Sequence, residues 1–288
     1  MGTPVLVLSY HRVNDVFDPN LKQLTVSISN FEKQIAFLKN NFTILRLTDS
    51  WKTKKNSVVI TFDDGYADNF YNALPILEKY DIPATLFPCT KNINTDQEFW
   101  WDRLSHLYSL LPNTFFVPEK AEKVTKEAYT HYAIGAVMQL KTDVEKLDWL
   151  QKFESLNAIK ITSRKEFKSL SNSEIIALSN HPLIDIGLHT HHHYNFKNLN
   201  ENQQYEELKL SLLQLEKRTE KKPIRYFALP HGGFNTQTFQ ITKKFQLITL
   251  LLNNQYSNTK NKETGKINRI LIPNLEELEF KNYINNFI

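Results

Sequence analysis

Short apolar runs rich in β-branched residues alternate along most of the chain with longer stretches in which apolar residues recur at helical spacing. The apolar runs, which we expect to form strands, cover residues 5–9, 43–45, 57–60, 84–88, 183–188 and 247–252. The amphipathic stretches, which we expect to form helices, cover residues 31–38, 66–80, 205–215, 239–245 and 275–284. This alternation predicts a parallel sheet with functional groups at the C-terminal ends of its strands.

Two local patterns refine this prediction. Residues 29–32, Ser-Asn-Phe-Glu, have the spacing of a capping box, so we expect the first helix to begin there. Residues 14–27 and residues 253–266 are polar and without a regular pattern. We expect both to be loops.

The alternation stops between about residues 92 and 173, which predicts a mostly helical insertion. Residues 119–153 have a helical pattern of apolar and charged positions. Trp100 and Trp101 stand near the start of the insertion, and two interpretations stay open for them. They stack on the apolar C–H face of a ligand, or they anchor the insertion on the rest of the domain. Asp102, which follows them, is a candidate helix cap.

Length and composition fit one α/β domain. With 288 residues, of which 41% are hydrophobic, the chain can bury a large core, and α/β barrels of this size commonly form a single domain. We therefore expect one domain over residues 1–288, with the insertion at about 92–173. Cys89 is the single cysteine, so it cannot form an internal disulfide, and we expect it to be a small core residue.

Charge and hydropathy exclude some classes of partner. The net charge of +4 is small for this length, and the basic residues are dispersed among nearly as many acidic ones, so nothing indicates nucleic-acid binding. No apolar run approaches the ~20 residues of a membrane span, and residues 1–4 lack the features of an export signal. We expect a cytoplasmic protein, although an exported protein whose signal has been removed would have the same sequence.

Two adjacent carboxylates stand where a predicted strand meets a predicted helix. Residues 61–65 read Thr-Phe-Asp-Asp-Gly. Two acids in one pocket repel each other unless a cation or a shared proton separates their roles. A metal ion would do so, because one carboxylate could bind it while the other accepts a proton. An acidic turn at the end of a strand is the simpler alternative.

A histidine cluster follows the apolar run of residues 183–188. Residues 187–193 read Gly-Leu-His-Thr-His-His-His, so His189 and His193 lie four positions apart. One carboxylate and two imidazoles make a three-ligand metal site that leaves room for water, as in hydrolytic metal centres. His191 and His192 have no predicted role, and a solvated loop is the alternative for the whole segment.

These two segments resemble motifs of a known family. Residues 61–65 and the His-Thr-x-x-His pattern of residues 189–193 are similar to the first two motifs of the polysaccharide deacetylases, the NodB-homology group of carbohydrate esterase family four. Residues 225–232, Arg-Tyr-Phe-Ala-Leu-Pro-His-Gly, resemble the family's Arg-x-Phe-x-x-Pro-x-Gly segment. Residues 8–13, Leu-Ser-Tyr-His-Arg-Val, resemble the start of many members. The resemblance implies a distorted (β/α)7-type barrel and a carbohydrate N-deacetylase.

The resemblance also assigns metal ligands and a base. It implies that Asp64, His189 and His193 bind a divalent metal, with zinc the first candidate. Cobalt and nickel accept the same ligand types, so they stay open. Asp63 would be the general base that takes a proton from a metal-bound water, the nucleophile.

The remaining roles concern the substrate. The resemblance implies that the backbone N–H of Tyr66 stabilises the oxyanion and that Pro230 and His231 form a wall of the substrate groove. Most members carry a C-terminal Leu-x-His motif for the general acid, but no histidine follows His231 here. Relatives that deacetylate poly-N-acetylglucosamine supply the acid from an early strand, and His11 fits that position. His231 is the competing acid, and a histidine that only hydrogen-bonds a loop is the simpler role for His11.

A second departure from the family concerns the arginine beside the base. The position two before Pro230 is Ala228, so the arginine expected there is missing. Arg225 or Arg269 would have to keep Asp63 ionised. For each arginine, an ordinary salt bridge is an equally good interpretation.

The predicted function is thus metal-dependent removal of an N-acetyl group from a sugar in a glycan or glycoconjugate. Two alternatives stay open, a non-catalytic carbohydrate-binding barrel and an amidohydrolase that acts on a small non-sugar amide. The particular sugar and the oligomeric state have no readable signal in the sequence.

Overall fold

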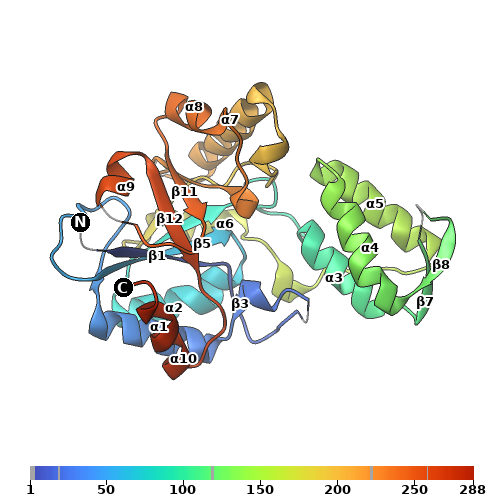
Figure 1. Ribbon diagram of the computed structural model, residues 1–288, viewed down its shortest axis with the longest axis horizontal. Helices are drawn as coiled ribbons and strands as arrows, with labels where there is room; N and C mark the ends of the chain where they lie inside the picture. The colour runs from blue at the N-terminus through green and yellow to red at the C-terminus, as the bar shows by residue number, and fades with distance from the viewer. Residues whose placement is uncertain (1–3, 19, 118–119, 221–222, 258) are drawn as a thin grey trace.

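Seven parallel strands form the centre of the computed structural model, which describes residues 4–18, 20–117, 120–220, 223–257 and 259–288 (Figure 1). Their order is β10-β11-β12-β1-β5-β6-β9. They are β1 (Val5–Tyr10), β5 (Ser57–Asp64), β6 (Ala84–Pro88), β9 (Ile184–Ile186), β10 (Tyr226–Ala228), β11 (Ile248–Leu252) and β12 (Lys266–Leu271). A parallel bridge between Leu188 and Phe227 joins the two ends of this order. The predicted distorted (β/α)7-type barrel is therefore confirmed.

Helices cover the outside of the strands. They are α1 (Ile28–Asn41), α2 (Leu74–Tyr80), α6 (Asn172–Asn180), α7 (Glu201–Arg218), α8 (Thr238–Lys244), α9 (Thr259–Glu263) and α10 (Glu277–Asn285). A short π-helix, η2 (Asn69–Ala73), leads into α2. The structure also contains several short elements. They include the strands β2 (Arg12–Val13), β3 (Thr25–Val26) and β4 (Thr43–Ile44) and the 3-10 helices η1 (Lys22–Leu24) and η3 (Lys165–Phe167). The predicted loops at 14–27 and 253–266 are thus wrong in part, because they contain η1, β3 and α9.

The start predicted for the first helix is also wrong by two residues. The N-cap of α1 is Ser27, whose hydroxyl accepts a hydrogen bond from the backbone N–H of Asn30 at 3.2 Å. Ser29 and Asn30 already lie inside the helix. The Asn30 side chain instead donates to Asn274 at 2.9 Å, a long-range contact that no local pattern predicts.

The central strand β5 shows how the two sides of the barrel wall are filled. All of its residues are buried, as is typical of a parallel strand covered on both faces. Val58, Ile60 and Phe62 belong to the hydrophobic cluster beneath the outer helices. Val59 belongs to a separate cluster with Val5, Val7 and Phe87. This alternation places Asp63, two positions after Thr61 and four after Val59, on the inner face of the barrel.

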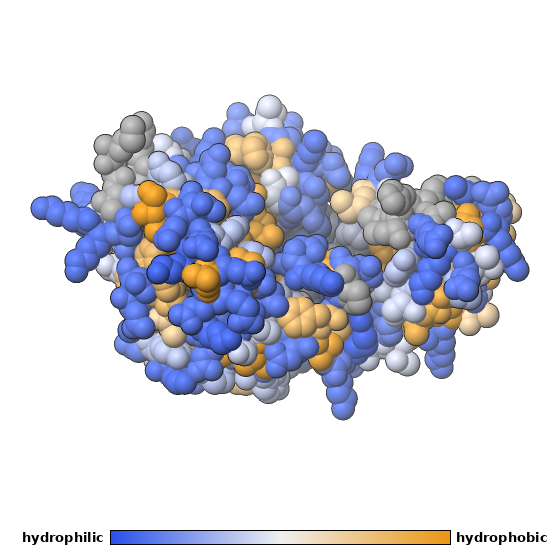
Figure 2. Space-filling view, turned by 60° about the horizontal axis from the view of Figure 1, so that its bottom comes forward, coloured by the Kyte–Doolittle hydropathy of each residue, from blue (hydrophilic) through white to orange (hydrophobic). Residues whose placement is uncertain are grey.

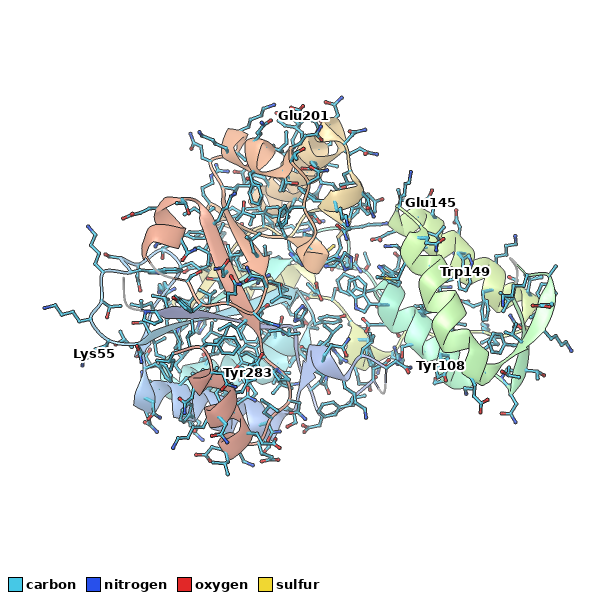
Figure 3. All side chains as sticks on the ribbon, viewed as in Figure 1. Lys55, Tyr108, Glu145, Trp149, Glu201 and Tyr283 are labelled. Atoms are coloured by element: carbon cyan, nitrogen blue, oxygen red, sulfur yellow. The ribbon has the colours of Figure 1, made fainter. Side chains whose placement is uncertain are left out.

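The segment between β6 and α6 forms a separate lobe at the right of Figure 1. It consists of α3 (Trp100–Leu110), α4 (Lys126–Gln139), α5 (Asp143–Leu156) and an antiparallel hairpin of β7 (Thr114–Val117) and β8 (Glu122–Thr125). Figure 3 shows Trp149 within this lobe, where it stacks on Phe153 at a ring separation of 5.1 Å. The predicted helical pattern began at Glu119, which lies outside the described residues. The hairpin that surrounds that position was not predicted.

The lobe shares its hydrophobic cluster with the barrel. Tyr66 and Cys89, from the ends of β5 and β6, are buried in the same cluster as Trp101 and Phe153 of the lobe. Cys89 is therefore a core residue, as expected. In the face drawn in Figure 2, hydrophilic residues dominate and the apolar ones are scattered. Across the residues that the structure describes, none of the helices has the length and hydropathy needed to span a membrane.

Candidate active site

Asp63 and Asp64 reach the same site because the backbone turns between them. Successive side chains of a strand point to opposite faces, so two adjacent carboxylates would ordinarily be separated by the sheet. Asp64 has a φ of 70° and Gly65 a φ of 83°, both in the left-handed region. The alternation therefore ends at Asp64, and both carboxylates line one cleft of about 330 Å³.

Gly65 makes this turn possible, which leads to a prediction. A Cβ at this position would lie 2.7 Å from Pro88 Cβ and 3.0 Å from Pro88 Cα, in addition to the unfavourable φ. We expect Gly65→Ala to lower the free energy of unfolding by about 1–3 kcal/mol in urea denaturation. Gly135→Ala is the matched control, since nothing lies within 4 Å of its Cβ and alanine favours the helix α4. Equal effects of the two substitutions would contradict the prediction.

Asp64 meets two imidazoles at the centre of the cleft. Its Oδ1 lies 3.2 Å from His189 Nε2 and 3.1 Å from His193 Nε2, and the two Nε2 atoms are 3.1 Å apart. All three residues are buried. His189 Nδ1 donates a hydrogen bond to the carbonyl of Ala228 at 2.8 Å, which leaves Nε2 free as a ligand.

The three atoms fit a divalent metal. Bonds of about 2.0–2.2 Å in a tetrahedron place neighbouring ligand atoms about 3.3–3.6 Å apart, slightly more than the separations found here. Within the described residues, Asp64 Oδ1 is buried without a hydrogen bond of acceptable geometry. A cation between the three groups would satisfy this oxygen. The structure thus brings together the three residues predicted as ligands.

Asp63 has a different environment. Its two carboxylate oxygens accept hydrogen bonds from Arg269 Nη1 and Nη2, each at 2.7 Å, and Arg269 is completely buried. Burial raises the pKa of Asp63, but the charges of Arg269 and His189 outweigh it, so the net shift is downward. Asp63 is therefore ionised at neutral pH. Of the two candidate arginines, the structure places Arg269 beside Asp63, whereas Arg225 is exposed at the start of β10 and the prediction for it is wrong.

The two candidate acids, His11 and His231, both line the cleft. His11 follows β1 and lines the cleft with a half-buried ring, and its buried Nδ1 has no hydrogen-bond partner within the described part of the chain. Burial lowers its pKa, although the charges of Asp64 and Asp63 oppose that shift. His231 also lines the cleft, at a ring separation of 4.6 Å from His193, but it is exposed. Their catalytic roles stay predictions.

Tyr66 and Pro230 are both buried, and of the two residues predicted to form a wall of the groove, His231 lines the cleft and Pro230 does not. The Tyr66 side chain is buried, and its hydroxyl donates to Asp102 Oδ2 at 2.6 Å and accepts from Trp101 Nε1 at 2.9 Å. These contacts fix the residue whose backbone N–H is the predicted oxyanion donor. Pro230 is buried in the short turn that presents His231.

Asp102 does not cap a helix, so that prediction is wrong. It lies in the first turn of α3, and the N-cap residue is Phe99, which makes no side-chain cap. Burial raises the pKa of Asp102 to about 8. Its link to Tyr66 was missed, because an acid within an aromatic run has no local signal for a partner 36 residues away.

The tryptophans anchor the insertion on the barrel, whereas their stacking on a sugar stays a prediction. Trp100 and Trp101 are buried in the cluster shared by lobe and barrel, and they also line the cleft. The Trp101 ring lies 4.8 Å from the ring of His193.

His192, which had no predicted role, pairs with Glu207 at 2.6 Å, and this contact anchors it to helix α7.

The fold and the site together define the class of protein. It is an α/β barrel in which one buried carboxylate, Asp64, lies beside two histidines, and a second carboxylate, Asp63, is paired with an arginine. Residues 50–249 match the model of the family described as polysaccharide deacetylase. The chain belongs to the polysaccharide deacetylase family, a class of carbohydrate deacetylases, and the predicted family is confirmed.

Individual relatives agree with this family. The poly-β-1,6-N-acetyl-D-glucosamine N-deacetylase of Staphylococcus aureus is 36% identical over 118 residues, which cover 35% of this chain and 41% of that protein. The chain spans less than half the length of the curated relatives it matches.

Two solved structures share the fold. A polysaccharide deacetylase from Bacillus cereus superposes with a TM-score of 0.65 at 22% identity, over 98% of this chain and 69% of that one. A Streptococcus pyogenes deacetylase in complex with acetate gives a TM-score of 0.59 at 19% identity, over 98% of this chain and 99% of that one.

Proposed function

We propose that this protein removes N-acetyl groups from the sugars of an N-acetylated glycan. The proposal rests on one observation: two adjacent buried carboxylates have different surroundings. Asp64 faces His189 and His193, whereas Asp63 is held ionised by Arg269. A site that only binds sugar has no need for a free base beside a metal site.

The chemistry follows from these positions. Asp64, His189 and His193 would hold a divalent cation, which would supply Lewis acidity when bound. Asp63 takes a proton from the water that attacks the acetamide carbonyl.

Two further groups complete the reaction. The backbone N–H of Tyr66 donates to the developing oxyanion. His11 gives a proton to the leaving amine, because expulsion of an unprotonated amide anion would be very slow. Zinc suits this set of ligands, and cobalt or nickel would also be accepted.

We further propose a polymer of N-acetylglucosamine as the substrate. The support is the relative named as a poly-β-1,6-N-acetyl-D-glucosamine N-deacetylase. The cleft, of about 330 Å³, is lined by Trp100 and Trp101, whose rings can pack on the apolar faces of a sugar.

The proposal is tested by incubating the purified, zinc-loaded protein with a β-1,6-linked N-acetylglucosamine octamer. We expect acetate and free amine to appear in equal amounts, and a chelator to stop their release until zinc is restored. Release that continues undiminished after verified metal removal would contradict the metal-dependent mechanism. Absence of acetate under all metal loadings would contradict the deacetylase function.

A further inference from the structure

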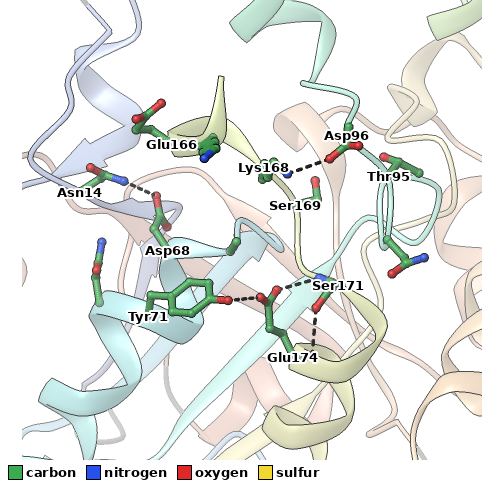
Figure 4. Close-up of a pocket in the computed structure, with 14 residues that line it drawn as sticks. Asn14, Asp68, Tyr71, Thr95, Asp96, Glu166, Lys168, Ser169, Ser171 and Glu174 are labelled. Carbon is green, nitrogen blue, oxygen red and sulfur yellow. Dashed lines mark hydrogen bonds and ion pairs between the residues drawn. The ribbon is translucent and has the colours of Figure 1, made fainter. Parts of the chain in front are cut away.

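A second hollow, the polar groove, lies outside the cleft and is larger, at about 660 Å³. Figure 4 shows it between the segment that follows β5 and the segment that leads into α6. The residues that matter here are Asn14, Asp68, Tyr71, Asp96, Ser169 and Glu174. None of the predicted catalytic or metal-binding residues lines it.

The groove is built on the same backbone as the cleft. Ser169 in the groove pairs with Tyr66 in an antiparallel bridge. The buried guanidinium of Arg12, which follows His11 of the cleft, pairs with Asp68 of the groove at 3.3 Å. Arg12 also lies over the rings of Phe167 and Tyr66, at 4.0 and 5.3 Å. The two hollows are therefore neighbours, and the buried side chain of Arg12 and the paired backbone of Tyr66 and Ser169 link them.

The charges in the groove are largely compensated. Asp68 pairs with Arg12, and Asp96 pairs with Lys168 at 2.8 Å. Lys165 and Glu166 add one charge of each sign, so Glu174 is the one lining charge that is not balanced. The groove therefore has little reason to select a strongly charged ligand. It offers instead many fixed hydrogen-bonding groups, including the Asn14 amide, which donates to Asp68 at 3.5 Å. Such groups suit a neutral ligand rich in hydroxyls.

Two side chains point to a ligand. The Tyr71 ring is 61% exposed, and its hydroxyl donates to Glu174, which limits the rotation of the ring (Figure 4). An exposed ring that is held in place is suited to stack on the C–H face of a sugar. The Ser169 hydroxyl is buried and lacks a hydrogen-bond partner among the described residues. A buried hydroxyl without a partner is costly, and a ligand hydroxyl in the groove would relieve that cost.

We propose that the polar groove binds a second sugar residue of the same glycan chain whose acetamide is hydrolysed in the cleft. This inference rests on the proposed function. It explains why a groove with compensated charges, a fixed exposed tyrosine and an unsatisfied hydroxyl lies beside the catalytic turn. A glycan long enough to occupy both hollows should then bind more tightly than one that fills the cleft alone.

The test compares β-1,6-linked N-acetylglucosamine oligomers of two and eight residues. We expect Tyr71→Ala, which removes the ring, and Ser169→Ala, which removes the buried hydroxyl, each to raise KM for the octamer by about tenfold and to leave KM for the dimer and both kcat values unchanged. Glu174→Gln keeps an oxygen that can accept from Tyr71 and keeps the capping box with Ser171, so it should leave both KM values unchanged. Tyr205→Ala, at a partly exposed tyrosine on α7, is the matched control and should change neither KM.

Two outcomes would overturn the groove as a subsite. One is an unchanged KM for the octamer in both the Tyr71 and the Ser169 variant, and the other is an equal change for dimer and octamer, which would indicate an effect through the fold. Calorimetry can measure binding of the octamer to Asp63→Asn and to the double variant Asp63→Asn, Tyr71→Ala, and this measurement requires no turnover. Weaker binding to the double variant would support the groove even if no acetate were ever released. A wrong groove proposal and a wrong deacetylase proposal can therefore be told apart.

Discussion

Asp63→Asn is expected to lower kcat for acetate release by about 10²–10⁴-fold, the usual contribution of a general base. Asparagine has nearly the same size but cannot accept the proton. The proposed metal ligands are Asp64, His189 and His193, so metal content measured by elemental analysis should stay near one ion per chain. The result expected is thus an inactive protein that still binds metal.

Two further variants serve as controls for this result. His189→Ala should lose both the metal and the activity, because it removes one of three ligands. Asp185→Asn makes the same chemical change in a partly exposed ion pair with Arg46, so it should keep both. An Asp63→Asn protein with more than a tenth of wild-type activity would show that another group is the base.

The strands β1, β5 and β6 could be predicted because they are covered on both faces. Such strands are continuous apolar runs, and β6 was predicted with its observed bounds, Ala84–Pro88. The run at 183–188 yielded a strand of only three residues, Ile184–Ile186. A Cβ at Gly187 would lie 2.2 Å from the Phe87 ring, so the backbone passes very close to β6 at that point. The pattern of apolar residues does not show how closely one segment of the backbone approaches a neighbouring strand.

The site could be predicted where its residues are adjacent in the sequence. Asp63 and Asp64 form one local motif, and His189 and His193 form another. The contacts of Tyr66 with Asp102 and of Arg12 with Asp68 could not be predicted, because they depend on how distant segments pack.

Four of the ten non-glycine residues with positive φ in the described part of the chain lie at the site. Asp64, Thr190, His193 and His231 all have positive φ values, of 70°, 68°, 61° and 55°. Non-glycine residues in this region cost of the order of 1–3 kcal/mol each and persist only where the surroundings hold them. At Thr190 the hydroxyl accepts from the His193 backbone N–H at 2.9 Å, which helps to hold the turn. The strain thus orients side chains that an unstrained strand or helix would direct elsewhere.

Arg269→Leu is expected to lower the free energy of unfolding by about 3–5 kcal/mol, because it leaves the buried Asp63 without its partner. Both side chains are almost inaccessible, at 0% and 3%, and they share two hydrogen bonds of 2.7 Å. The double variant Asp63→Leu, Arg269→Leu removes both charges and should recover most of the loss. The measurement is urea denaturation at neutral pH with a chelator present, so that different metal affinities do not contribute.

The control for this cycle is the exposed pair of Lys33 and Glu276, whose side chains are 44% and 66% accessible. Lys33→Leu should change stability by no more than about 1 kcal/mol, because water screens the pair. A loss of similar size for Arg269→Leu would mean that Asp63 avoids the cost of burial by taking up a proton. Asp63 could then not act as a base in the variant, because the arginine that keeps it ionised in the wild type is missing. The stability of the Arg269 variant therefore tests, without any substrate, whether this arginine keeps the proposed base ionised.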